Sequence, residues 1–71
     1  MKLIMSRHAL EQARERGISI NEIRACIQRG AKSMQGKKII AMYRHIKVVY
    51  KKIEDCNFVI TAMIRGEKNG K

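Results

Sequence analysis

The chain has 71 residues and lacks proline and tryptophan, and its only aromatic residues are two tyrosines and one phenylalanine. It also lacks internal repeats, low-complexity segments and any stretch with the composition of a linker. A chain this short buries only about 60% of its unfolded surface, which excludes a deep, enclosed active site. Because 45% of its residues are hydrophobic, it can still fold. We therefore expect one domain over residues 1–66 and a flexible polar tail over residues 67–71.

Long hydrophobic runs are also missing. The start of the chain, MKLIMSRH, becomes charged after a short apolar stretch, and no later run approaches the length that spans a bilayer. We therefore expect no signal peptide and no membrane partner, and the expected location is the cytoplasm.

Cysteine is scarce as well. Cys26 and Cys56 stand in no CxxC or CxH spacing, so they carry no metal signature. A zinc site built from these two residues with His8 and His45 would be an unpatterned set of a kind found in many chains. We expect two reduced, apolar cysteines, no metal and no cofactor.

Acidic residues are absent between Glu22 and Glu54, in a chain with a formal net charge of +10. Nine cations fall inside this interval, and they are Arg24, Arg29, Lys32, Lys37, Lys38, Arg44, Lys47, Lys51 and Lys52. Such a field attracts polyanions, which favours RNA as a partner over a surface that is merely solvated. The predicted nucleic-acid-binding residues are Arg14, Lys37, Lys38, Tyr43, Arg44, Lys47, Lys51 and Lys52.

Two consecutive helices are predicted in the first half. Ser6 can cap a helix that Gly17 closes, and Ser19 to Glu22 forms a capping box that begins another, which Gly30 ends. At about 100° per residue, one face of the first helix groups Ala9, Leu10 and Ala13. The adjoining face holds His8, Gln12 and Glu15, with Arg16 at the seam. In the second helix, the apolar stripe consists of Ile20, Ile23 and Ile27.

From Ala31 onward, β-rich runs alternate with turn residues. We predict a turn at Gln35-Gly36, strands at about Lys38–Tyr43, Ile46–Ile53 and Phe58–Arg65, and turns at Arg44-His45 and Asp55–Asn57. In the middle strand, Lys47, Val49 and Lys51 share the face opposite Val48. Lys2–Met5 is either a short edge strand or a lead-in. The expected fold is α+β, with two N-terminal helices packed on an antiparallel sheet of three to four strands.

Metal-independent RNA cleavage needs a base, an acid and cations for the developing phosphorane charge. His8 is the natural proton carrier, because the unperturbed pKa of histidine, ~6.5, lies near working pH. Arg16 and Arg65 can hold the phosphate with a planar guanidinium fork, so the predicted catalytic residues are His8, Arg16 and Arg65. In the alternative interpretation, His8 forms a hydrogen bond with a nearby carbonyl, and Arg16 has a structural role, with its guanidinium on strand carbonyls. His45 is interpreted as a turn residue.

His8 and Ala9, followed by Glu15 to Ser19, resemble the N-terminal signature His-Ala-x-x-Arg-x-x-Glu-Arg-Gly-Ile-Ser of a prokaryotic family of unknown function. That family is similar to the RelE- and BrnT-like toxins. The resemblance implies a RelE-like fold, in which helices pack on a curved antiparallel sheet, and often RNA cleavage without metal. The later run Val59 to Thr61 also fits it. Gln12 replaces the signature arginine, and if that arginine contacts phosphate in active relatives, the chain lacks a contact that catalysis uses.

Two function classes therefore stay open. The first is an RNA-directed toxin-like endoribonuclease, either active or weakened by Gln12. The second is a non-catalytic module that holds RNA or an acidic protein such as an antitoxin. The sequence does not fix the oligomeric state.

Overall fold

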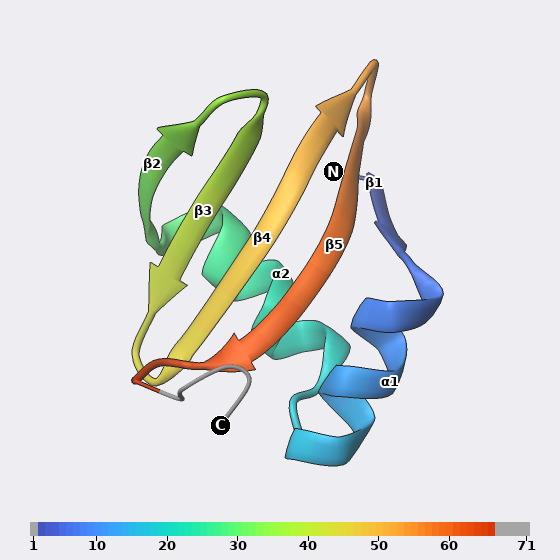
Figure 1. Cartoon of the computed structure of the whole chain (residues 1–71), viewed down its shortest axis with the longest axis vertical. Helices are drawn as coiled ribbons and strands as arrows, with labels where there is room; N and C mark the ends of the chain where they lie inside the picture. Colours follow the sequence, from blue (N-terminus) through green and yellow to red (C-terminus); the bar gives the residue numbers. More distant parts are fainter. Residues whose placement is uncertain (1, 67–71) are drawn as a thin grey trace.

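The computed structural model describes residues 2–66 as a five-stranded sheet covered on one side by two helices (Figure 1). The elements follow in the order β1 (Lys2–Met5), α1 (Arg7–Arg16), α2 (Ile20–Arg29), β2 (Ala31–Gln35), β3 (Lys38–Tyr43), β4 (Ile46–Ile53) and β5 (Cys56–Ile64). The order of strands in the sheet is β1-β5-β4-β3-β2. β2 to β5 are antiparallel neighbours, whereas β1 pairs with β5 in parallel.

The expected RelE-like sheet of three to four antiparallel strands behind two N-terminal helices is therefore wrong. The sheet has five strands, is mixed, and receives its first strand before either helix. β1 has only four residues, too few to display a clear alternation, and its partner lies at the far end of the chain. All five residues of β2 are exposed, so that strand lacks the apolar signal of a buried one. The predicted tail, residues 67–71, lies outside the described residues.

Both predicted helix starts are confirmed. Ser6 Oγ accepts from the Ala9 backbone N at 3.0 Å, and Gly17 closes α1 at a φ of 68°. At α2, Ser19 Oγ accepts from Glu22 N at 3.1 Å while Glu22 Oε1 accepts from Ser19 N at 2.9 Å. These two capped helices set the positions of the side chains that face the sheet.

The predicted apolar stripes are only partly buried. Ala9 and Ala13 are buried, but Leu10 is 42% exposed and Ile20 is 40% exposed. Small alanines let α1 approach β5 and β1 closely, so only a narrow strip of the helix reaches the sheet. In α2 the buried strip consists of Ile23, Cys26 and Ile27.

The strands β3 and β4 have the predicted bounds, whereas β5 begins at Cys56, two residues earlier than predicted. The reason is the preceding turn, in which Glu54 adopts a φ of 55° and lets Ile53 pair directly with Cys56. The predicted Asp55–Asn57 turn is therefore wrong in its last two residues. The pairing between β4 and β5 shifts register between Val49 and Tyr50, because β5 carries one extra residue, Ile60, at this point.

The two faces of the sheet differ in what lies against them. On the face toward the helices, hereafter the covered face, Ala41, Val48 and Ala62 lie side by side on neighbouring strands and are fully buried. No helix of residues 2–66 packs against the other face, hereafter the open face. No helix in this part of the chain is both long and apolar enough to cross a membrane.

Candidate nucleic-acid interface

The open face is built from the alternate residues of β3, β4 and β5. In β4, Val48 and Tyr50 are buried on the covered face, and Lys47, Val49 and Lys51 point the other way, as predicted. Directly paired residues share a face, so the strand register extends this surface across the sheet. Its members on these strands are Lys38, Ile40, Met42, Lys47, Val49, Lys51, Ile53, Cys56, Phe58, Thr61 and Met63.

Three lysines share this surface with its single aromatic residue, Phe58. Lys51 is directly opposite Phe58, and Lys38 lies one position beyond the Ile39–Tyr50 pair, beside Lys51. Lys47 is four residues before Lys51 and thus about 13 Å away along β4. Phe58, Lys47 and Lys51 are all half-buried, which means that the lysine stems lie along apolar neighbours while their ammonium groups can reach solvent.

These cations have no acidic partner within the described chain. Between residues 2 and 66 the salt bridge joins Arg16 to Glu15 at 3.6 Å, and it includes none of the nine cations between Glu22 and Glu54. The charge that the sequence concentrates in this interval is therefore not neutralised locally. An unneutralised cationic surface attracts phosphates.

A second cationic group lies at the β3–β4 turn. Arg44 occupies the left-handed region at a φ of 57°, and its guanidinium lies 5.4 Å from the centroid of the Tyr43 ring. Arg65 holds this turn with two hydrogen bonds, in which its backbone N donates to the His45 carbonyl at 2.7 Å and its Nη1 donates to the Arg44 carbonyl at 2.9 Å. Arg65 therefore fixes the position of Arg44 and His45.

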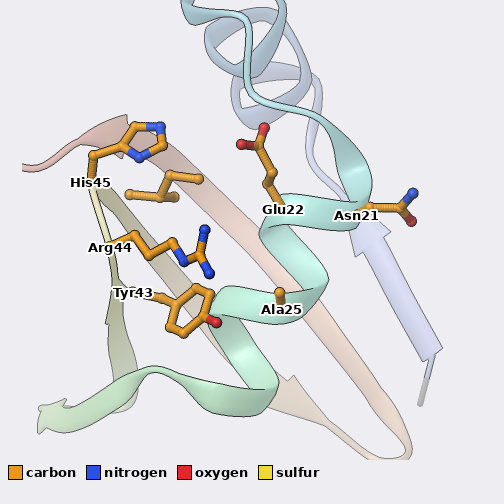
Figure 2. A pocket seen from close by; sticks show the side chains of 7 residues that line it. Asn21, Glu22, Ala25, Tyr43, Arg44 and His45 are labelled. Atoms are coloured by element: carbon orange, nitrogen blue, oxygen red, sulfur yellow. The ribbon is translucent and has the colours of Figure 1, made fainter.

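The turn faces the beginning of α2 across a pocket of about 270 Å³. The turn contributes Tyr43, Arg44, His45 and Ile46, and α2 contributes Asn21, Glu22 and Ala25. Figure 2 shows Glu22 on one wall, with Arg44 and His45 across from it, and the Asn21 side chain pointing away. The pocket thus combines one carboxylate with cationic and aromatic groups.

Local hydrogen bonds and charges shift two pKa values at this site. The backbone N–H of Ser19 lowers the pKa of Glu22, and the nearby His45 lowers it further. Hydrogen bonding from Arg29 and then from Arg44 lowers the pKa of the Tyr43 hydroxyl. Glu22 therefore stays ionised at neutral pH, and the Tyr43 oxygen lies within reach of two guanidinium groups.

The structure brings some of the predicted binding residues together and leaves others apart. Lys38, Lys47 and Lys51 share the open face, and Tyr43 and Arg44 form the turn that Arg65 holds. Lys37 is exposed in the β2–β3 turn, Arg14 is exposed on α1, and Lys52 pairs with Asn57 near the end of β4. The predicted interface thus separates into a sheet surface, a turn and scattered cations.

The predicted catalytic residues lie on different elements. His8 is exposed at the start of α1, and its side chain makes no hydrogen bond or ion pair within residues 2–66. Arg16 follows eight residues later, about 12 Å along the helix axis. Arg65 lies at the β3–β4 turn, where it contacts Arg44. The catalytic assignment of His8, Arg16 and Arg65 stays a prediction.

Gln12 has a structural contact that the sequence did not indicate. Its Oε1 accepts a hydrogen bond from the Ala62 backbone N at 3.3 Å, which ties α1 to β5. The two cysteines are free thiols, and burial raises the pKa of Cys26, which lies in the core. Across residues 2–66 no three His, Cys, Asp or Glu side chains lie close enough together to hold a metal ion.

Sequence reasoning missed His45, Glu22 and Arg29 as members of a shared site. Each had a visible local role, since His45 lies in a predicted turn, Glu22 in the capping box and Arg29 at the end of α2. A signal was present in the run Tyr43-Arg44-His45, which concentrates chemically active side chains in one tight turn. That α2 packs beside this turn depends on a long-range contact, which periodicity does not encode.

Residues 5–64 match the model of a protein family described as a domain of unknown function, DUF4258. The match covers most of the chain, so the chain belongs to this family. The family description assigns no activity. Neither a curated protein nor a solved structure matches the chain.

Proposed function

We propose that this member of the DUF4258 family binds single-stranded RNA on the open face of its sheet. The observation that carries the proposal is that Lys51 lies beside Phe58, with Lys38 and Lys47 on the same face, on the side that no helix of residues 2–66 covers. Cationic side chains bind phosphates, and the accessible side of a half-buried aromatic ring can stack on a base. The two contacts that single-stranded RNA requires therefore lie side by side.

The arrangement favours a single strand over a duplex. Phe58 can stack only on a base that is not already stacked between neighbours in a helix. Lys51 lies directly across the strand from Phe58, so a phosphate next to the stacked base meets an ammonium group. Val49 and Ile40 continue the same surface with apolar contacts.

Between the two functions that the sequence leaves open, the geometry supports binding better than cleavage. A toxin-type ribonuclease, as the resemblance to RelE- and BrnT-like proteins implies, needs its proton carrier and phosphate ligands around one phosphodiester. The start of α1, where His8 lies, is tied to Ile60, because Ser6 Oγ donates a hydrogen bond to the Ile60 carbonyl. Arg65 is five residues further along the chain, about 16 Å along the strand. The predicted proton carrier and this predicted phosphate ligand are therefore held apart. An RNA-binding module does not require these residues to meet.

The proposal is tested by two double variants with the same change in net charge. Lys47→Ala/Lys51→Ala removes cations from the open face, and Arg7→Ala/Arg24→Ala removes cations from the helices. The affinity for a fluorescent single-stranded RNA is measured by anisotropy as a function of salt. Because each phosphate contact contributes about −0.7 to the slope of log K against log salt, the first variant should flatten the slope by about 1.4 and the second should not.

An equal effect of both variants would mean that the charge acts diffusely and that the open face is not the binding surface. Tight binding of an acidic peptide together with no binding of RNA would instead identify a protein partner. His8→Ala tests cleavage separately. If the wild-type protein cuts RNA and this variant does not while still binding it, the ribonuclease interpretation of the sequence is correct.

A further inference from the structure

The pocket between α2 and the β3–β4 turn has the size of a site for a small, flat group. At about 270 Å³ it is smaller than the usual range for drug-sized ligands, about 300–1,000 Å³. It opens beside His45 on the helix side of the β3–β4 turn, and His45 is two residues, about 7 Å of chain, before Lys47 on the open face, so an RNA strand reaches both by passing around the turn. A single RNA strand bound to Lys47 can therefore place one nucleotide at this pocket.

Glu22 presents an oriented hydrogen-bond acceptor to the pocket. Its Oε1 is fixed by the Ser19 backbone N–H at 2.9 Å, and its other oxygen accepts no hydrogen bond from residues 2–66. An ionised carboxylate can only accept hydrogen bonds. A partner for Glu22 must therefore present N–H or O–H groups and no acceptor at the same position.

The opposite wall offers a flat, cationic surface. The Arg44 guanidinium lies over the Tyr43 ring, and Arg65 holds the Arg44 carbonyl. A guanidinium plane supported in this way can stack on a nucleobase. Together the two walls suit a base that stacks on Arg44 and donates hydrogen bonds to Glu22.

We propose that this pocket receives one guanine base from the RNA strand, with Glu22 accepting hydrogen bonds from its Watson–Crick edge. The inference rests on the proposed function, since the open face holds the rest of the strand. Guanine presents two adjacent donors, N1–H and the N2 amino group, which match the two oxygens of a carboxylate. Adenine and cytosine each present a ring-nitrogen acceptor next to a single amino group, and uracil presents one N–H between two carbonyls. Each of these three places an acceptor against Glu22.

The test uses four fluorescent RNA nonamers, an all-uridine strand and strands with guanosine, inosine or adenosine at the centre. Inosine keeps N1–H and lacks the 2-amino group. With the full wild-type chain, we expect the guanosine strand to bind about 5- to 150-fold more tightly than the all-uridine strand, as for a bidentate contact. The inosine strand should lie between them, and the adenosine strand should match the all-uridine strand.

Glu22→Gln is the decisive variant, because glutamine preserves the capping box and removes one of the two acceptor oxygens. It should abolish the preference for guanosine, so that the guanosine and all-uridine strands bind with the same affinity. Glu11→Gln, the same substitution on the exposed surface of α1, serves as the matched control and should retain the preference. The comparison of guanosine with inosine needs no variant, so it stands even if Glu22→Gln fails to fold.

Three results would overturn parts of the proposal. Equal binding of the four strands by the wild-type protein would overturn the guanine pocket and leave RNA binding on the open face in place. A preference that survives Glu22→Gln would show that another group reads the base. Failure to bind any strand would overturn the proposed function together with the pocket.

Discussion

Strand β4 contributes to two surfaces with opposite requirements. Val48 is fully buried on the covered face between Ala41 and Ala62, whereas the next residue, Val49, lies half-buried on the open face between Ile40 and Thr61. The covered face is apolar and closely packed, and the open face mixes apolar residues with unpaired lysines. The comparison indicates that stability and binding can be changed separately along one strand, because alternate residues serve each.

The largest loss of stability is expected at Gly30, where close packing against the backbone leaves no space for a side chain. A Cβ atom on Gly30 would lie 2.5 Å from the Cys26 carbonyl oxygen and 2.6 Å from the Met42 carbonyl oxygen, both of them backbone atoms. Gly30→Ala should therefore lower the free energy of unfolding by about 3 kcal/mol or more, measured by urea denaturation. Gly36→Ala is the control, since Gly36 lies in open space at a φ of 64° and should lose only about 1 kcal/mol. Equal losses would contradict the close approach of α2 to β3.

A smaller effect should separate the two neighbouring valines. Val48→Ala removes two methyl groups from a fully buried site and should cost about 2–3 kcal/mol of unfolding free energy, whereas Val49→Ala should cost less than about 1 kcal/mol. Denaturation curves for both variants, collected under the same conditions, provide the measurement. If Val49→Ala proves as costly as Val48→Ala, the open face is packed against something and is not a free binding surface.

The smallest effect concerns the ionisation of the two tyrosines, Tyr43 beside the β3–β4 turn and Tyr50 on the covered face. Arg29 and Arg44 lower the pKa of Tyr43, whereas burial on the covered face raises the pKa of Tyr50. Phenolate absorbance should therefore titrate in two steps, with Tyr43 ionising below the ordinary phenol value and Tyr50 above it. Arg29→Gln should move the first step upward and leave the second unchanged. A single step at the ordinary value would contradict both assignments.

The directions of these two pKa shifts determine how each tyrosine changes the stability of the fold with pH. A lowered folded pKa means that Tyr43 stabilises the fold above its ordinary pKa, and that this contribution is lost as the pH falls through the lowered value. A raised folded pKa means that the contribution of Tyr50 is present below its ordinary pKa and is lost as the pH rises through the raised value. At neutral pH, both hydroxyls are protonated, so Tyr43 contributes no such stabilisation there.

Local signals in the sequence predicted the helices and the central strands well. Ser6, Gly17 and the Ser19–Glu22 capping box act within a few residues, so their chemistry is visible without the fold. The alternation of lysine and valine in β4 likewise predicted which residues share a face. Burial of Leu10 and Ile20 was wrongly expected, because the width of a helix stripe depends on how closely the helix approaches the sheet.

What the sequence could not supply were pairings between distant segments. The parallel pairing of β1 with β5 joins Lys2 to Cys56 and has no local signature. The pocket depends in the same way on α2 lying beside the β3–β4 turn, which brings Glu22 opposite His45. Among the predicted site residues, Lys38, Arg44, Lys47 and Lys51 lie on the surfaces that we propose bind RNA, whereas Lys52 and His8 lie outside them.

The placement of β1 at the edge beyond β5 also fixes an order in which the molecule can be assembled. Ser6 donates a backbone hydrogen bond to the Val59 carbonyl, so the start of α1 is held by a residue made more than fifty positions later. During synthesis, the first strand leaves the ribosome long before its partner exists, and closing so large a loop delays the contact further. Residues 2–5 must therefore remain unpaired until β5 is made, and a nascent chain that stops at Ile53 has α2 with β3 and β4 but lacks β5, the strand that α1 mainly contacts.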